Sequence, residues 1–201
     1  MFAHGILWVI GLAGIVIGTR GLYRQTRQRE ELKEKLFILS ITDTLTGLHN
    51  RRGFLSLAAQ QLQLADRTKR KLLLFFADLD GMKWINDTQG HEQGDKALIE
   101  AASIFKNTFR SSDIIARIGG DEFAVLAVDA VTSNVTPENL VDRLQRSLDA
   151  YNDQAKRKYK LSISVGYALY DPDNPLSIDD LMSNADKMMY IQKKNKNRAP
   201  H

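Results

Sequence analysis

The sequence contains no cysteine, which excludes disulfides, thiolate zinc sites and cysteine nucleophiles. Its four histidines, at positions 4, 49, 91 and 201, lack the spacing of metal ligands. There is no Ser–His–Asp arrangement and no GxxxxGK[ST] phosphate-binding loop. These absences remove hydrolase triads, P-loop enzymes and most zinc proteins from consideration.

Aromatic residues make up only 8% of the chain, but 43% of its 201 residues are hydrophobic, close to the average of globular proteins. This composition argues against wholesale disorder, and the length predicts one domain with at most a short appendage. The net charge of +4 and the pI of about 9.2 raise the question of a nucleic-acid partner. The answer depends on where the basic residues lie.

Charged residues are missing entirely from Phe2 to Thr19. As a helix, these 18 residues span about 27 Å, close to the hydrocarbon thickness of a bilayer. A buried core helix and a cleaved signal peptide are the alternatives, but no basic residue precedes the apolar run and no A-x-A-like site follows it. We therefore expect residues 1–22 to form a transmembrane anchor helix, in which Gly14-x-x-x-Gly18 can mediate helix contacts.

Six basic residues follow within residues 20–35, against three glutamates. The positive-inside rule then places the rest of the chain in the cytoplasm, anchored by a single pass in a bacterial inner membrane. Residues 23–40 are expected to form a juxtamembrane helical stalk, either a short coiled coil through Leu32, Leu36 and Leu39 or a plain solvated helix. The remaining chain has 22 basic and 21 acidic residues, which argues against a nucleic-acid partner.

Periodicity and turn signals predict a domain over residues 41–198. Its elements alternate as helix, strand, helix, strand, strand, helix, strand, helix, with Gly81–Thr88 read as short and irregular. The order predicts an α+β fold with a ferredoxin-like (palm-type) βαββαβ core, an antiparallel sheet and helices on one face. The expected helices cover about 50–67, 95–109, 136–151 and 177–193, and the expected strands cover 71–79, 113–118, 122–128 and 161–170.

Two acidic pairs come at strand ends. Asp78 and Asp80 end the all-apolar strand, and Asp121-Glu122 follows the Gly119-Gly120 turn. Either pair alone suits an ordinary turn. In a βαββαβ sheet, however, these strands can lie side by side, so that the two pairs converge at one edge. All-oxygen sites of this kind suit Mg²⁺ or Mn²⁺ shared with substrate phosphates, as in nucleotide phosphoryl transfer.

Four blocks in family-like order and spacing resemble the GGDEF family, the diguanylate cyclases. They are residues 43–52 (DTLTGLHNRR), 78–95 (DLDGMKWINDTQGHEQGD), 117–123 (RIGGDEF) and 162–166 (SISVG). The resemblance implies condensation of two GTP into cyclic di-GMP, with release of two pyrophosphates, by a homodimer. A catalytically silent receptor for cyclic di-GMP or GTP is the alternative, against which the intact motif residues argue.

The resemblance also implies roles for the matching residues. Asp78, Asp121 and the Leu79 carbonyl would hold the metal with support from Glu122, and Asp121 would accept the proton of the ribose 3′-hydroxyl. Lys83 would stabilise charge on the triphosphate. Further substrate contacts are implied for Asn86, Asp95, Gly119, Gly120, Arg117, Lys193 and Lys196.

Asn86 and Asp95 would read the guanine base, because a carboxylate can accept from both donors of its Watson–Crick edge. In the last helix the family often continues with Gly and a basic residue, whereas this chain has Lys196-Asn-Arg198, so the second basic role falls to either Lys196 or Arg198. Arg110 and Asp113 match the family's RxxD product-inhibition site, at which cyclic di-GMP would act as an inhibitor.

Overall fold

The computed structural model describes residues 23–25, 27–29, 37–128, 136–154 and 159–198. The chain divides into two compact units, residues 1–40 and Ile41–His201. In the first unit, the described residues 23–25, 27–29 and 37–40 are helical. Within the described parts of the chain, no helix is both long and apolar enough to span a bilayer. The predicted anchor, residues 1–22, lies outside those parts.

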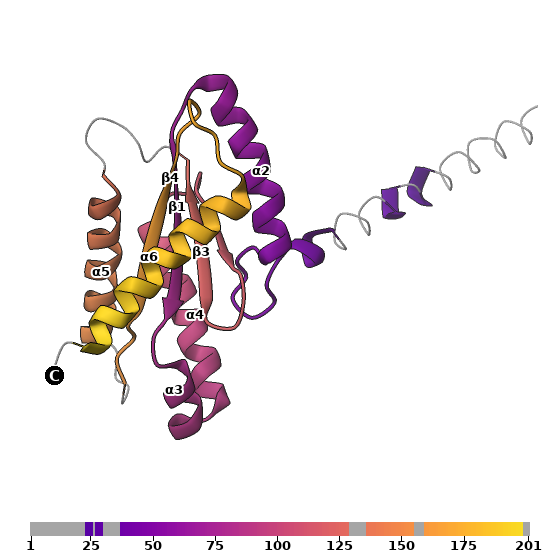
Figure 1. Cartoon of the computed structure of the whole chain (residues 1–201). Helices are drawn as coiled ribbons and strands as arrows, with labels where there is room; N and C mark the ends of the chain where they lie inside the picture. The colour runs from indigo at the N-terminus through magenta and orange to yellow at the C-terminus, as the bar shows by residue number, and fades with distance from the viewer. Residues whose placement is uncertain (1–22, 26, 30–36, 129–135, 155–158, 199–201) are drawn as a thin grey trace, which may run out of the picture. The chain divides into compact units, whose positions relative to one another are not determined.

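The second unit contains a four-stranded, fully antiparallel sheet in the order β2-β3-β1-β4 (Figure 1). The predicted strand order along the chain and the antiparallel sheet are confirmed. β1 lies inside the sheet, paired with β3 on one side and β4 on the other. Every one of its eight residues is buried, as its largely apolar sequence indicates. The strands are β1 (Leu72–Leu79), β2 (Ile114–Arg117), β3 (Glu122–Ala127) and β4 (Ile163–Tyr170).

Helices cover both faces of this sheet, not one face as expected. Alternate residues of β1 point to opposite sides, so that Leu73 and Phe75 pack with α4 and α5, while Leu74 and Phe76 pack with α2 and α6. In Figure 1, α6 crosses the sheet obliquely. The two helices inside the βαββαβ core, α4 and α5, do share one face of the sheet, as predicted. The first and last helices of the unit, α2 and α6, cover the opposite face, which the prediction left without helices. These helices are α2 (Arg51–Thr68), α4 (His91–Thr108), α5 (Pro137–Gln154) and α6 (Ile178–Arg198).

A further helix, α3 (Met82–Gln89), forms where an irregular segment was expected. Met82 and Ile85, three residues apart, are buried against the first face of the sheet, so the helix is held by tertiary packing. Gly90, at φ 88°, separates α3 from α4, which begins at His91 and not at Asp95. This places Lys83 and Asn86 on a rigid element beside the end of β1.

Candidate functional site

Strand pairing brings the two acidic segments together. Asp78, at the end of β1, stands opposite Glu122, the first residue of β3. The amide of Leu79 donates to the carbonyl oxygen of Asp121 at 3.0 Å. The convergence expected from the order of elements is therefore present, and it is set by backbone hydrogen bonds.

The electrostatics of this cluster favour a bound cation. Burial raises the pKa of the Asp78 carboxyl, which is only 8% exposed, and the charge of Asp121 adds to the rise, while a hydrogen bond from Lys193 opposes it. Burial likewise raises the pKa of Glu122, with further contributions from Asp121 and Asp78. Like charges gathered beside an apolar strand are costly unless a positive charge compensates them.

A divalent cation fits this donor set when a substrate completes it. Among the described residues, no three His, Cys, Asp or Glu side chains are grouped so that they could hold a metal ion by themselves. Two carboxylates and a backbone carbonyl leave coordination positions for phosphate oxygens, which is the usual manner in which proteins bind Mg²⁺. Asp78, Asp121 and the Leu79 carbonyl are thus suitable ligands for a nucleotide-bound ion.

Asp80 belongs to a separate network. Its carboxylate accepts hydrogen bonds from the hydroxyls of Ser162 and Ser164, each at 2.7 Å. Lys196 pairs with the same carboxylate at 3.3 Å and donates to the Ile163 carbonyl at 2.6 Å. Asp80 therefore ties the end of β1 to the start of β4 and to α6, and the structure places the ammonium of Lys196 in that contact.

Lys193, one turn earlier in α6, joins the acidic cluster instead. Its ammonium nitrogen lies 2.5 Å from Oδ1 of Asp78. Burial would lower the pKa of Lys193, but the hydrogen bond to Asp78 and the nearby Asp80 and Asp121 carboxylates raise it. Lys193 is thus a firmly charged group within reach of any phosphate that approaches Asp78.

A cavity of about 460 Å³ opens beside the cluster, between α3, α4 and the connection from β2 to β3. It brings together six residues that the sequence singles out, from three separate segments. They are Lys83, Asn86, Asp95, Arg117, Gly120 and Asp121. The cavity is therefore large enough for a small polar ligand. The carboxamide of Asn86 and the carboxylate of Asp95 line it from α3 and α4, and Asp121 lines it from the hairpin.

Gly94, which also lines this cavity, was not assigned a role from the sequence. A Cβ at this position would overlap the carboxamide of Asn86. The absence of a side chain on α4 therefore lets Asn86 lie against that helix. The sequence offered little signal, because the predicted helix began at Asp95, whereas Gly94 lies inside the observed α4, where glycine costs about 1 kcal/mol relative to alanine.

The connection between β2 and β3 is a tight hairpin, as expected. The amide of Ile118 donates to the Glu122 carbonyl at 2.8 Å. A Cβ on Gly119 would come within 2.8 Å of Oε2 of Glu122, whereas one on Gly120 would meet no described atom within 4 Å. Gly120 thus faces the open cavity, and its lack of a side chain leaves that space to a ligand.

Arg117 holds this hairpin from the side. Its Nε and one terminal nitrogen donate to the Gly120 carbonyl at 3.0 and 2.7 Å. The other terminal nitrogen lies 3.3 Å from both carboxylate oxygens of Asp43. Arg117, for which the resemblance implies a substrate contact, is therefore directed at the backbone next to Asp121.

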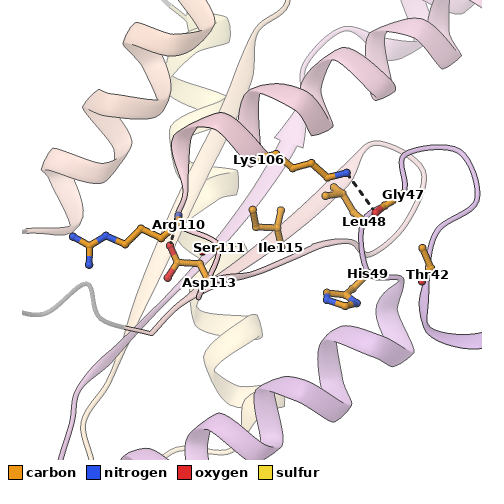
Figure 2. A pocket seen from close by; sticks show the side chains of 9 residues that line it. All are labelled: Thr42, Gly47, Leu48, His49, Lys106, Arg110, Ser111, Asp113 and Ile115. Carbon is orange, nitrogen blue, oxygen red and sulfur yellow. Dashed lines mark hydrogen bonds between the residues drawn. The ribbon is translucent and has the colours of Figure 1, made fainter. Parts of the chain in front are cut away.

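A second cavity, of about 290 Å³, lies beside the turn that precedes β2 (Figure 2). It includes the predicted product-site residues Arg110 and Asp113, but Figure 2 shows the Arg110 side chain directed away from His49 and Lys106. The Asp113 carboxylate accepts hydrogen bonds from the amides of Arg110, at 2.9 Å, and Val128, at 3.1 Å. Asp113 thus orders its own turn as well as facing the cavity.

Comparisons with known proteins agree with this geometry. The family model described as diguanylate cyclase, GGDEF domain, matches residues 40–199. The chain is 37% identical over 161 residues to the bifunctional diguanylate cyclase/cyclic di-GMP phosphodiesterase MucR of Pseudomonas aeruginosa, covering 79% of this chain and 23% of MucR. It is 32% identical over 188 residues to the diguanylate cyclase DgcP of Escherichia coli, covering 90% of this chain and 54% of DgcP. The chain thus spans about a quarter to a half of these relatives.

Solved structures show the same fold. The GGDEF domain of TpbB (YfiN) from Pseudomonas aeruginosa is 34% identical, with a TM-score of 0.69 over 77% of this chain and 89% of that one. The coiled coil and GGDEF domain of DgcB from Caulobacter crescentus, solved in complex with cyclic di-GMP, is 25% identical, with a TM-score of 0.76 over 88% of this chain and 92% of that one. With four motif blocks in place and a family model that covers most of its length, the chain belongs to the GGDEF-domain family of diguanylate cyclases.

Proposed function

We propose that this chain is an active diguanylate cyclase that condenses two GTP molecules into cyclic di-GMP and releases two pyrophosphates. The observation that carries the proposal is the pairing of β1 with β3, which sets Asp121 beside Asp78 at the rim of a cavity that also holds Lys83, Asn86 and Asp95. A degenerate receptor has no need of all these groups together.

Each residue has a physical task in this reaction. Asn86 and Asp95 hydrogen-bond the guanine edge and orient the nucleotide. Asp121 accepts the proton of the ribose 3′-hydroxyl while the 3′-oxygen forms a bond to the α-phosphorus of the other GTP. The bond from that phosphorus to the pyrophosphate oxygen breaks at the same time. Lys83 and Lys193 offset the negative charge that develops on the leaving pyrophosphate.

The metal ion, Mg²⁺ or Mn²⁺, would be held by Asp78, Asp121 and the Leu79 carbonyl, with Glu122 nearby, and when bound it neutralises triphosphate charge and activates the attacking oxygen. Glu122 stands opposite Asp78 in the sheet, and its carboxylate lies against Gly119. It would therefore support the metal ligands from the hairpin side.

In this proposal the cavity formed by the described residues Lys83, Asn86 and Asp95 holds a single GTP, whereas the product joins two nucleotides. We therefore infer that two copies of the chain face each other, each supplying one bound GTP. The homodimer is part of the proposal, and the stalk over residues 23–40 would hold the two domains close together.

The direct test is synthesis of cyclic di-GMP by purified protein given GTP and Mg²⁺, followed by chromatography. We expect product from the wild type and none above background from Asp121→Ala. A matched control, Asp153→Ala, removes an exposed carboxylate of α5 and should retain activity. Binding of cyclic di-GMP or GTP without any turnover, at every protein concentration, would instead establish the receptor function.

We further propose that cyclic di-GMP inhibits the enzyme at Arg110 and Asp113. Support comes from their RxxD spacing and from the cavity beside their turn. Inhibition by added product should be lost in Arg110→Ala while the rate without product is retained. Equal inhibition of the wild type and this variant would disprove the assignment.

Membrane anchoring by residues 1–22 is likewise a proposal, supported by the uncharged stretch from Phe2 to Thr19 and the basic residues that follow. The full chain should sediment with inner membranes after cell lysis and resist extraction by high salt, with the domain accessible from the cytoplasm. A variant that lacks residues 1–22 should stay in the supernatant. Salt-extractable full-length protein would contradict an integral anchor.

A further inference from the structure

The turn over residues 42–49, here called the 42–49 turn, contains a carboxylate that the proposed reaction does not use. Asp43 has a side chain that is 22% exposed, and it accepts hydrogen bonds from the amide and the hydroxyl of Thr46 at 2.9 and 2.6 Å. Burial alone would raise the pKa of Asp43, but the bonds from Thr46 and the nearby Arg117 lower it. The carboxylate is therefore ionised and fixed in direction.

The 42–49 turn is itself rigidly held. Asp43 donates its amide to the Leu48 carbonyl at 2.8 Å, which closes the turn. His49 then joins β2 from the side, since its amide donates to Ile115 at 3.2 Å and its carbonyl accepts from the Arg117 amide at 2.9 Å. Asp43 thus has a fixed position relative to the strand that leads into the catalytic hairpin.

Arg117 bridges this fixed carboxylate to the hairpin. Its Nε and Nη2 both donate to the Gly120 carbonyl. The remaining terminal nitrogen, Nη1, donates to the Asp43 carboxylate. The Arg117 side chain is 17% exposed, and its contact with Asp43 is partly buried. A planar guanidinium with partners on two edges has little freedom to rotate.

We propose that Asp43 is a positioning residue that acts through Arg117 to fix the Gly120 carbonyl, and with it the direction of the adjacent Asp121 carboxylate. The inference rests on the proposed function for its substrate and goes beyond it by assigning a role to a residue outside the cavity. Without Asp43, Arg117 loses one of its two partners and the hairpin gains freedom next to the reacting groups. Misplacement by about 1 Å can reduce turnover on the order of 100-fold.

A double-mutant cycle in the full chain tests the proposal. Asp43→Asn keeps the shape and an acceptor for Thr46 but removes the charge that faces Arg117, and Arg117→Lys removes the forked contact with Gly120. We expect Asp43→Asn to lower kcat by about 10-fold or more, with KM for GTP changed less than about 3-fold because Asn86 and Asp95 are untouched. In the Arg117→Lys background, the same change should cost less than about 2-fold in kcat. An equal loss in both backgrounds would overturn the proposal.

Thr46→Val is the matched control, since it removes the hydroxyl bond within the turn and leaves the contact between Asp43 and Arg117 intact. A purely structural role for Asp43 predicts that Thr46→Val and Asp43→Asn lower the melting temperature and kcat in parallel. The positioning role predicts a smaller loss of kcat from Thr46→Val at an equal loss of stability.

Hydrogen exchange separates this proposal from the proposed function. The segment 118–121 should exchange faster in Asp43→Asn and in Arg117→Lys, and to the same extent in the double variant. This readout needs no turnover, so it decides the case even if the wild type makes no cyclic di-GMP. Unchanged exchange of the segment in Asp43→Asn would refute the link between Asp43 and the hairpin.

Discussion

At Gly94 the backbone of α4 leaves just enough space for the carboxamide of Asn86. Replacing Gly94 by alanine should displace Asn86 and raise KM for GTP about 10-fold or more, because loss of one base contact costs on the order of 1.4 kcal/mol. Helix propensity alone would make the variant slightly more stable. GTP titration and steady-state kinetics measure the effect.

Glu92→Ala, an exposed change two residues earlier in α4, is the control and should leave KM unaltered. A Gly94→Ala variant with normal KM would show that Asn86 does not read the base.

Glu122 illustrates a conflict between stability and function. Its raised pKa means that the folded protein disfavours the ionised form, so the ionised carboxylate destabilises the domain. Glu122→Gln should therefore increase the free energy of unfolding at pH 8 while lowering activity.

The gain has a defined pH dependence. It should disappear as the pH falls below the ordinary glutamate pKa of about 4.5, where the side chain is neutral in both states. Urea unfolding of the metal-free protein at several pH values measures it. Destabilisation at pH 8 would mean that Arg51, the one group that lowers the pKa of Glu122, outweighs the surrounding carboxylates.

Some of these residues could be predicted from the sequence and others could not. The meeting of Asp78 with Asp121 follows from strand order, because pairing of β1 with the hairpin dictates it. The contacts of Lys193 with Asp78 and of Arg117 with Asp43 join side chains 115 and 74 positions apart, and no periodic pattern encodes them. The position of Asn86 depends on the missing side chain of Gly94, which emerges only when α3 and α4 pack.

At the scale of elements, β4 and α2 are joined by a partly buried polar contact between the buried Tyr170 and the exposed Asp66. The Tyr170 hydroxyl donates to Asp66 at 2.5 Å, and burial together with this bond raises the pKa of Tyr170 to about 12. Tyr170→Phe should cost about 0.5–1.5 kcal/mol of stability at neutral pH. Urea denaturation followed by circular dichroism checks the value.

The sign of the pH effect follows from the raised pKa. The contact contributes fully below the ordinary tyrosine pKa of 10, and its contribution is lost as the pH rises toward 12. The difference between wild type and Tyr170→Phe should therefore shrink over that interval. A difference that stays constant from pH 8 to 11.5 would argue that the hydroxyl acts through packing alone.

The sequence located β1 within one residue, since seven of its eight residues are apolar and only Asp78 interrupts the run. It missed α3 because eight residues with two buried positions are too short for a helical period to stand out. It also left the second face of the sheet uncovered, although Phe54, Ala58 and Leu62 form an apolar stripe on α2. Which face a helix covers depends on the handedness of its connections, and a helix outside the βαββαβ unit is not fixed by that rule.

At the scale of the whole molecule, the proposed dimer of half-sites would make activity depend on protein concentration. The unit of residues 41–201 should show a specific activity that rises with protein concentration until dimers dominate. Fusing a parallel dimeric coiled coil before residue 41 should remove this dependence, because tethering raises the effective concentration toward the millimolar range. Rates of cyclic di-GMP formation over a 1000-fold dilution series, taken as roughly nanomolar to micromolar, test it.

The same unit fused at the same junction to a coiled coil whose pairing is disrupted by like charges is the appropriate control. Constant specific activity of the isolated unit across the whole series would point to a pre-formed dimer or to a single-chain mechanism, and would remove the tethering role of the stalk.

The backbone bond from Leu79 to Asp121 has a consequence for how this family tolerates insertions and deletions. Because register along β1 and β3 sets which carboxylates meet, a one-residue deletion inside β3, at Val125 and about 10 Å from Glu122, puts the residues on its two sides out of phase with β1. A deletion scan should therefore find the interiors of the strands intolerant even far from the acidic end, whereas a substitution scan should find the loss of activity concentrated at that end.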